Sequence, residues 1–250
     1  MQNLVIISML VSNCMHKLCT NYFLHLLTPI LFYVIVSHPA TKWIAHRECS
    51  RIQKNDWNMS HRLYQRIQHI VNDISPQLDI FDKASLLSND TKFGRYSAFL
   101  SEGNDTTKVS NNTHQLQYQP ITCNGNLRLY KYDKGQWFGK HVDESNKIDS
   151  SNISNPFDFS DDNDVKDAQT EITVLFYLST CTGGATRFHL PHSSSKKKKK
   201  SKDDTSVAFV PEEGAVLLHI HGDRCLEHEA EPVLDGVKYV LRTDIVYGMK

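Results

Sequence analysis

The sequence predicts a mainly β (α+β) fold of the jelly-roll type, supported by a helix near its N-terminus. Five segments with an apolar period of two predict the strands, at 127–132, 170–179, 206–210, 215–221 and 236–247. Gly, Pro and Asp turn signals separate these segments. Several are apolar on both faces, which is typical of a sheet packed inside a sandwich or barrel. A helical pattern precedes the strands, so we expect a β core with helical support.

The supporting helix is predicted by apolar residues at helical spacing after Ser60, which we expect to cap it. Met59 and Tyr64 are placed to form a hydrophobic staple across this cap, and Pro76 ends the pattern. The apolar positions are Leu63, Ile67, Ile70, Val71 and Ile74. The polar residues 82–118 then indicate loops, with one short strand at 96–100.

Composition excludes several classes of protein. Among the 250 residues, Lys plus Arg and Asp plus Glu each number 28, which argues against a general binder of nucleic acid. Hydrophobic residues make up 40%, too many for a disordered chain. No two of the 6 cysteines have Cys-x-x-Cys spacing, which argues against a zinc ribbon or a dense disulfide scaffold and leaves their disulfide state open.

Residues 1–45 form a hydrophobic N-terminal segment, distinct from a domain expected over 55–250. The apolar run 22–36 is shorter than the ~20 residues of a spanning helix and contains Pro29. A signal anchor, a cleaved signal peptide, a hairpin and a segment outside the folded unit all remain open. Membrane contact through 22–36 depends on that choice. A cytoplasmic or nuclear location is favoured unless the segment is an anchor, which would place the protein at the endoplasmic reticulum or another membrane.

Two polar insertions interrupt the predicted strands, at 144–168 and 193–204. The second contains five consecutive lysines, 196–200, followed by two aspartates. We interpret both insertions as solvated loops, because a single block of like charge is usually solvated. A localisation or nucleic-acid signal is the alternative for the lysine run.

The first candidate site follows the first of these strands. His141 and Asp143 are two residues apart, so both side chains point to one face of an extended backbone. An imidazole and a carboxylate are two of the three ligands in a 2-His-1-carboxylate metal site, which is typical of non-haem Fe(II) oxygenases. The third ligand has to come from elsewhere in the fold.

His228 and the strand after it supply the missing features. A Pro and an Asp-Gly turn follow His228, and Lys238, Val240 and Arg242 then share one face of a strand. A cation on a largely apolar strand requires an anionic partner, because burying it alone is costly. A dicarboxylate ligand would provide one. The alternative is a surface position for Lys238, or a pair with Asp235 or Asp244.

The remaining histidines have simpler interpretations. His219 and His221 lie on a predicted core strand and are interpreted as non-ligands. His189 and His192 flank the lysine loop and are interpreted as solvated. Cys225 lies three residues before His228, and we expect it to have a packing role.

Five blocks resemble the 2-oxoglutarate- and Fe(II)-dependent dioxygenases in order and spacing, most closely the branch that contains prolyl 4-hydroxylases. The resemblance covers roughly residues 120–247, and the blocks are YDKGQWFGKHVDES, ITVLFYLS, GGATRFH, VPEEGAVLLHIHGD and LEHEAEPVLDGVKYVLRTD. It implies a double-stranded β-helix, which is a jelly roll, with helices on one side. It also implies Fe(II), 2-oxoglutarate, O2 and ascorbate as cofactors and cosubstrates.

The resemblance assigns roles to single residues. His141, Asp143 and His228 match the metal ligands. Lys238 matches the basic residue that binds the far carboxylate of 2-oxoglutarate, and Arg242 is its rival. Tyr132 matches a tyrosine that hydrogen-bonds the cosubstrate, and Tyr177 is a second wall residue.

The implied reaction is hydroxylation of a prolyl residue in a protein substrate, with release of succinate and CO2. Hydroxylation of another side chain and demethylation of a nucleic acid are alternatives within the superfamily. A jelly-roll binding module that has lost catalysis is an alternative of another class, and it predicts a missing ligand or anchor. The oligomeric state stays open.

Overall fold

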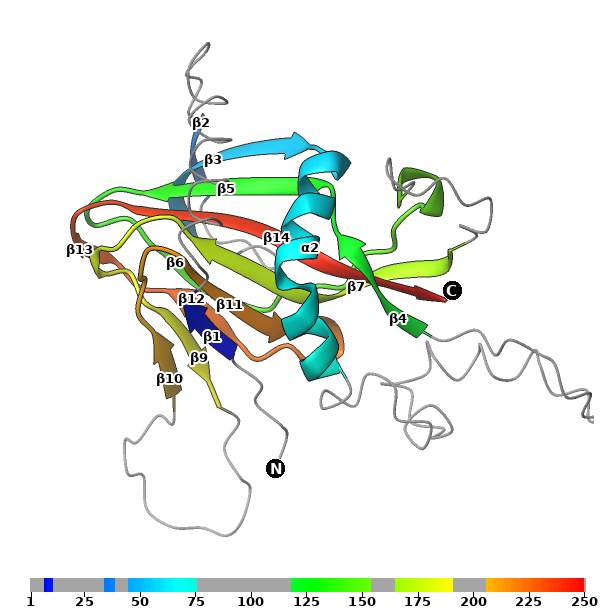
Figure 1. Cartoon of the computed structure of the whole chain (residues 1–250). Helices are drawn as coiled ribbons and strands as arrows, with labels where there is room; N and C mark the ends of the chain where they lie inside the picture. Colours follow the sequence, from blue (N-terminus) through cyan, green and yellow to red (C-terminus); the bar gives the residue numbers. More distant parts are fainter. Residues whose placement is uncertain are drawn as a thin grey trace, which may run out of the picture.

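The computed structural model describes residues 7–10, 34–38, 45–75, 118–153, 165–190 and 206–249. These residues form a curled antiparallel sheet and a helix that crosses it (Figure 1). The predicted mainly β jelly roll with a supporting helix is confirmed. The helices are α2 (Trp57–Ile74) and the short 3-10 turns η2 (Ser150–Ile153) and η3 (Gly222–Arg224). The strands are β1 (Ile7–Leu10), β2 (Val34–His38), β3 (Arg47–Asn55), β4 (Tyr118–Cys123), β5 (Asn126–Tyr132), β6 (Phe138–His141), β7 (Lys166–Tyr177), β8 (Thr182–Gly183), β9 (Thr186–His189), β10 (Ser206–Phe209), β11 (Ala215–Ile220), β12 (His228–Ala230), β13 (Val233–Asp235) and β14 (Lys238–Met249).

The main sheet runs in the order β1-β11-β7-β14-β5-β3-β6-β12-β9-β10, with β2 also paired to β3 and β4 to β14. Strand β3 joins its two halves, because it pairs with β5 over residues 50–55 and with β6 at Arg47. The sheet curls at this join, so that β6 and β12 come to line one cavity together with β5 and β14. A second sheet pairs β13 with β8.

Helix α2 covers the outer face of this sheet (Figure 1). Leu63, Ile67 and Val71 are fully buried against β5, β7 and β14, in one hydrophobic core. Burying an aliphatic side chain of this size contributes about 1.5–3 kcal/mol, so this apolar stripe holds the helix on the sheet. The opposite face of β14 lines the cavity with Lys238 and Arg242, as the alternation of the strand predicts.

The start of the helix differs from the prediction. Asp56 is the N-cap, and its side chain accepts a hydrogen bond of 2.9 Å from the amide of Met59. Ser60 lies inside the helix, where its hydroxyl donates to the carbonyl of Trp57. The prediction that Ser60 is the cap was therefore wrong. A carboxylate three residues before Met59 satisfies the exposed amide, and the helix begins earlier.

The strands that the sequence did not predict include the first three of the chain. Strand β3 spans Arg47–Asn55, before the expected start of the folded domain at residue 55. Strands β1 and β2 come from the N-terminal segment 1–45 and pair with β11 and β3. The rest of the apolar run 22–36, apart from its last residues in β2, lies outside the described residues. No helix in the described part of the chain is long and apolar enough to cross a membrane.

The predicted polar insertions are only partly described. The first contains η2, and its last residues already belong to β7, which begins at Lys166. The lysine-rich insertion 193–204 lies outside the described residues, as do His192 and the short strand predicted at 96–100. The cysteines in the described ranges are free thiols, namely Cys49, Cys123, Cys181 and Cys225.

Candidate metal and cosubstrate site

Two histidines meet at the ends of neighbouring strands. His141 is the last residue of β6, His228 is the first of β12, and the two are direct partners in the antiparallel ladder. Their ring centroids are 4.3 Å apart. This pairing brings together two residues that are far apart in the sequence.

Asp143 completes this group from the loop just after β6. Its carboxylate oxygens lie 3.8 Å from His141 Nε2 and 3.6 Å from His228 Nε2. All three side chains are at least half-buried, and together they form a group of donor atoms that could hold a metal ion. The predicted His-x-Asp pair and the distant histidine therefore lie at one point.

Backbone carbonyls fix the orientation of both imidazoles. The carbonyl of Gly139 lies 2.8 Å from His141 Nδ1, and that of Leu226 lies 2.9 Å from His228 Nδ1. A carbonyl only accepts hydrogen bonds, so each Nδ1 carries the proton and each Nε2 presents a lone pair to Asp143. Burial lowers the pKa of His141 to about 4 and also lowers that of His228. Both rings are neutral at pH 7, which is the form that binds metals.

Asp143 is held by two further residues. Arg242 Nη1 donates to one of its oxygens at 2.7 Å, and the Thr173 hydroxyl donates to the other at 2.9 Å. Burial alone would raise the pKa of Asp143, but the Arg242 guanidinium outweighs it and holds the pKa well below its usual value. Asp143 is therefore ionised at neutral pH. Arg242 also contacts Asp244 at 3.4 Å, so two carboxylates neutralise this guanidinium.

Lys238 lies deeper in the cavity and is 2% exposed. Its ammonium group donates to the carbonyl of Gly184 at 2.7 Å, and it lies 5.3 Å from the ring centre of Tyr132 and 5.6 Å from that of Tyr177. No carboxylate of the described residues forms an ion pair with it, and burial lowers its pKa to about 8. A buried cation held by one carbonyl and two aromatic faces lacks the anion that would neutralise it.

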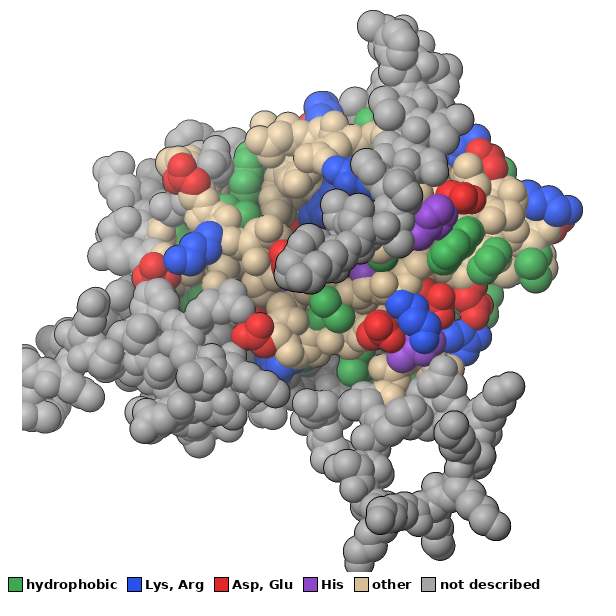
Figure 2. Space-filling model, turned by 180° about the vertical axis from the view of Figure 1, so that it is seen from behind, with side chains coloured by type: hydrophobic (Ala, Val, Ile, Leu, Met, Phe, Trp, Pro, Cys, Tyr) green, Lys and Arg blue, Asp and Glu red, His purple; other side chains and the backbone are tan. Residues whose placement is uncertain are grey.

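These groups line one cavity of about 460 Å³, measured out to its open mouth. The predicted residues that line it are His141, Asp143, His228, Lys238, Arg242 and Tyr132. Tyr177 is not part of this lining. Its hydroxyl lies 2.7 Å from that of Thr186, and the centre of its ring lies 5.6 Å from the Lys238 ammonium group. On the face shown in Figure 2, acidic and basic side chains are interspersed.

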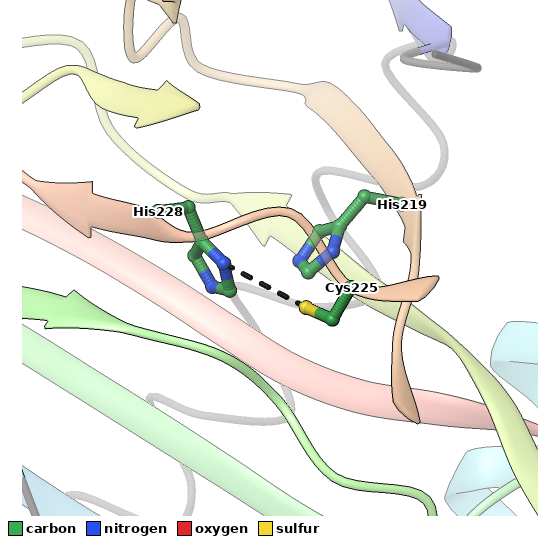
Figure 3. Close-up of side chains that lie close together, drawn as sticks. All are labelled: His219, Cys225 and His228. Carbon is green, nitrogen blue, oxygen red and sulfur yellow. Dashed lines mark hydrogen bonds between the residues drawn. The ribbon is translucent and has the colours of Figure 1, made fainter. Parts of the chain in front are cut away.

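Sequence reasoning interpreted His219 as a non-ligand, and the structure places it beside the proposed ligands. This residue of β11 points into the same region as His228, and their ring centroids are 4.7 Å apart (Figure 3). His219 Nε2 lies 3.7 Å from Asp143. Only the fold brings β11 next to the site. The sequence signal was the alternation along β11, which places His219 on the face opposite to Leu218. Leu218 belongs to the hydrophobic core that contains α2.

Two other interpretations also need correction. His189 is not solvated, because its Nε2 lies 2.9 Å from Glu229 and its side chain is only 11% exposed. Cys225 does more than pack, because the amide of Asp143 donates to its sulfur at 3.2 Å. His221, by contrast, is engaged by the hydroxyls of Thr173 and Thr170, away from the metal-ligand group.

Comparison with known families identifies this arrangement. The sequence model of the 2OG-Fe(II) oxygenase superfamily matches residues 127–243, a range that contains His141, Asp143, His228, Lys238 and Arg242. Residues 127–243 of the chain belong to this superfamily. Its members use Fe(II), 2-oxoglutarate and O2. A search of curated protein sequences found no match.

Solved structures with a similar fold include three prolyl hydroxylases. One from Pseudomonas putida is 12% identical, with 96% of this chain and 91% of that one covered at a TM-score of 0.45. A viral collagen prolyl hydroxylase from Paramecium bursaria Chlorella virus-1 is 13% identical, with 97% and 95% covered at a TM-score of 0.42. A prolyl hydroxylase from Trichoplax adhaerens, in complex with a hypoxia inducible factor peptide fragment, is 13% identical, with 98% and 83% covered at 0.45. Likeness at this level assigns no substrate.

Proposed function

We propose that this 2OG-Fe(II) oxygenase holds Fe(II) through His141, Asp143 and His228, binds 2-oxoglutarate through Lys238, and hydroxylates a prolyl residue of a protein. The observation that carries the proposal is the convergence of two imidazole lone pairs on an ionised carboxylate, at 3.6–3.8 Å. Groups that only accept hydrogen bonds do not gather in a buried site without a cation or a proton donor between them. Two imidazoles and a carboxylate are the donor set of non-haem Fe(II) oxygenases.

The cosubstrate would bind with its far carboxylate at Lys238. The cavity joins Lys238 to the proposed ligands, and the cation has no carboxylate partner among the described residues. A dicarboxylate that reaches from the metal to Lys238 would supply that anion. Arg242, the rival anchor, already contacts both Asp143 and Asp244, which supports Lys238.

The protein's own contribution is to orient these groups and to keep the site dry. Gly139 and Leu226 hold the imidazoles in the ligating tautomer, and Arg242 with Thr173 fixes the carboxylate. Tyr132 would cover the cosubstrate, since it is the register partner of Lys238 on β5. When bound, the iron would couple oxidative decarboxylation of 2-oxoglutarate, giving succinate and CO2, to hydroxylation of a substrate C–H bond.

The choice of a prolyl substrate rests on sequence. The five sequence blocks resemble the prolyl 4-hydroxylase branch in order and spacing. The balanced formal charge of the sequence gives no support to a nucleic-acid substrate. A protein substrate fits these observations better.

The proposal is tested by incubating the purified protein with Fe(II), 2-oxoglutarate, ascorbate and a library of proline-containing peptides. We expect succinate to form, together with a mass gain of one oxygen that tandem mass spectrometry places on proline. Oxygen on another side chain, or demethylation of a nucleic acid, would contradict the substrate assignment alone. His141→Ala and Asp143→Ala should abolish turnover, whereas His69→Gln on the exposed face of α2 should not. Full activity in both alanine variants would refute the ligand assignment.

A further inference from the structure

We propose that His219 is a fourth protein donor to the metal, bound through Nε2 while 2-oxoglutarate is absent. This inference rests on the proposed function, because it requires a metal at His141, Asp143 and His228. It adds a ligand from β11, a strand that carries none of the other three.

The first argument is the unsatisfied nitrogen of His219. Its side chain is 5% exposed, and Nε2 has no hydrogen-bond partner among the described residues. Nδ1 lies 3.2 Å from the carbonyl of Ile220, so the proton is on Nδ1 and Nε2 is an acceptor. A buried acceptor without a partner is destabilising, and a metal ion would remove that cost.

The second argument is the direction in which this nitrogen points. Nε2 lies 3.7 Å from Asp143 Oδ2, which is beyond hydrogen-bond reach, and the same oxygen lies 3.6 Å from His228 Nε2. Two imidazole acceptors therefore face one carboxylate oxygen, with His141 Nε2 facing the other oxygen.

A second set of donors shares two of these residues and must be distinguished. His219, Cys225 and His228 also lie close enough together to bind a metal (Figure 3). In that set the Cys225 sulfur faces His228 Nδ1, at 3.9 Å, but this nitrogen already donates to the carbonyl of Leu226. The Nε2 atoms of His219 and His228, by contrast, both face Asp143 Oδ2, at 3.7 and 3.6 Å.

Cosubstrate binding should release His219. A facial triad leaves positions for both the chelating 2-oxoglutarate and O2, whereas a fourth protein ligand occupies one of them. Turnover therefore requires His219 to leave when the cosubstrate binds. His219 would then close the site only in the resting enzyme.

The test counts metal-bound imidazoles in the full-length protein loaded anaerobically with Co(II). Each histidine bound through Nε2 gives one solvent-exchangeable, paramagnetically shifted Nδ1–H resonance in the proton NMR spectrum. We expect three such resonances in the wild type, two in His219→Phe, and three in the matched control His189→Gln. Addition of 2-oxoglutarate should reduce the wild-type count to two. The affinity of His219→Phe for Co(II) should fall about tenfold.

Two resonances in the cosubstrate-free wild type would overturn the proposal, whether or not His219→Phe folds. A third resonance that persists after 2-oxoglutarate is added would also overturn it. A thiolate-to-Co(II) absorption band that Cys225→Ala removes would overturn it as well, because it would place the metal at Cys225. The count does not depend on turnover. If the wild type shows three resonances but does not consume 2-oxoglutarate, the proposed function alone is refuted. If it consumes 2-oxoglutarate but shows only two resonances in its absence, the role of His219 alone is refuted.

Discussion

His141 faces His228 directly across the β6–β12 ladder, and this register brings the two imidazoles together. A shift of one residue in either strand would turn one ring to the opposite face of the sheet. The pairing of β12 with β9 fixes this register from the other side, with His228 opposite Phe188. The positions of the two histidines are therefore a property of the sheet.

Replacement of Lys238 by alanine should raise the KM for 2-oxoglutarate more than tenfold, because a charge-assisted contact to the far carboxylate is lost and such contacts contribute about 1.5–3 kcal/mol. The measurement is the rate of succinate formation as a function of cosubstrate concentration. Arg242→Ala serves as the comparison, since it should weaken metal binding through Asp143 instead. If Arg242→Ala raises this KM and Lys238→Ala does not, the choice of anchor is wrong.

Thr173 should tune metal affinity without touching the metal. Its hydroxyl donates to Asp143 and lies 3.0 Å from His221 Nδ1, so Thr173→Val removes one of the two side-chain donors to the carboxylate. We expect the metal affinity to fall about 10–100-fold, the range seen when an outer partner of a metal ligand is removed. Thr173→Ser keeps the hydroxyl and should stay near the wild type. Equal losses of affinity in both variants, measured by anaerobic titration, would argue against this role.

The metal-free protein should lose stability as the pH falls below about 6.5. Burial, aided by His228, lowers the pKa of His141 to about 4, whereas an unfolded histidine titrates near ~6.5. Between these values the unfolded chain binds a proton that the folded chain does not, so the free energy of unfolding decreases with falling pH. His141→Gln should reduce this decrease by up to roughly 3 kcal/mol.

The measurement is urea unfolding of the metal-free proteins between pH 7.5 and about 4. The exposed His69 on α2 provides the control, because His69→Gln should leave the pH dependence of the wild type intact. A pH dependence in His141→Gln as steep as in the wild type would mean that His141 is not responsible for it.

A substitution in the hydrophobic core between α2 and the sheet should change the stability of the protein without changing cosubstrate binding. Ile67 is fully buried between α2 and the sheet, on the face opposite the cavity. Ile67→Ala should therefore lower the free energy of unfolding by about 2–5 kcal/mol, with an unchanged KM for 2-oxoglutarate at a temperature where the variant stays folded. Denaturant unfolding and cosubstrate kinetics on the same preparation test both parts. A large rise in KM would show that the helix acts on the cavity as well as on the sheet.

The strands in which apolar residues clearly alternate could be predicted from the sequence, because the apolar positions are the ones that face the core. Lys238 and Arg242 share the cavity face of β14 as expected. Strand β3 was not predicted, because its sequence RECSRIQKN is mostly polar and is a strand through its pairing with β5. The helix cap was placed at Ser60 because several residues near this N-terminus can cap, and only the fold selects Asp56.

The candidate site was predictable where its members lie two residues apart, as with His141 and Asp143. His228 was predicted through resemblance, since no local pattern shows which distant strand will be its neighbour. His219 could not be placed, because its contact with Asp143 depends on the pairing of β11 with β7, opposite Thr173. Tyr177 was predicted as a second wall residue of the cosubstrate site and is not among the residues that line the cavity.

The central claim is tested most directly by anaerobic addition of Fe(II) and 2-oxoglutarate to the metal-free protein, followed by visible absorption. We predict the weak charge-transfer band of an iron-bound 2-oxo acid, saturating at one equivalent of each, and its absence in Asp143→Ala. A wild-type protein that binds Fe(II) and 2-oxoglutarate without this band, or an Asp143→Ala variant that keeps it, would contradict the account.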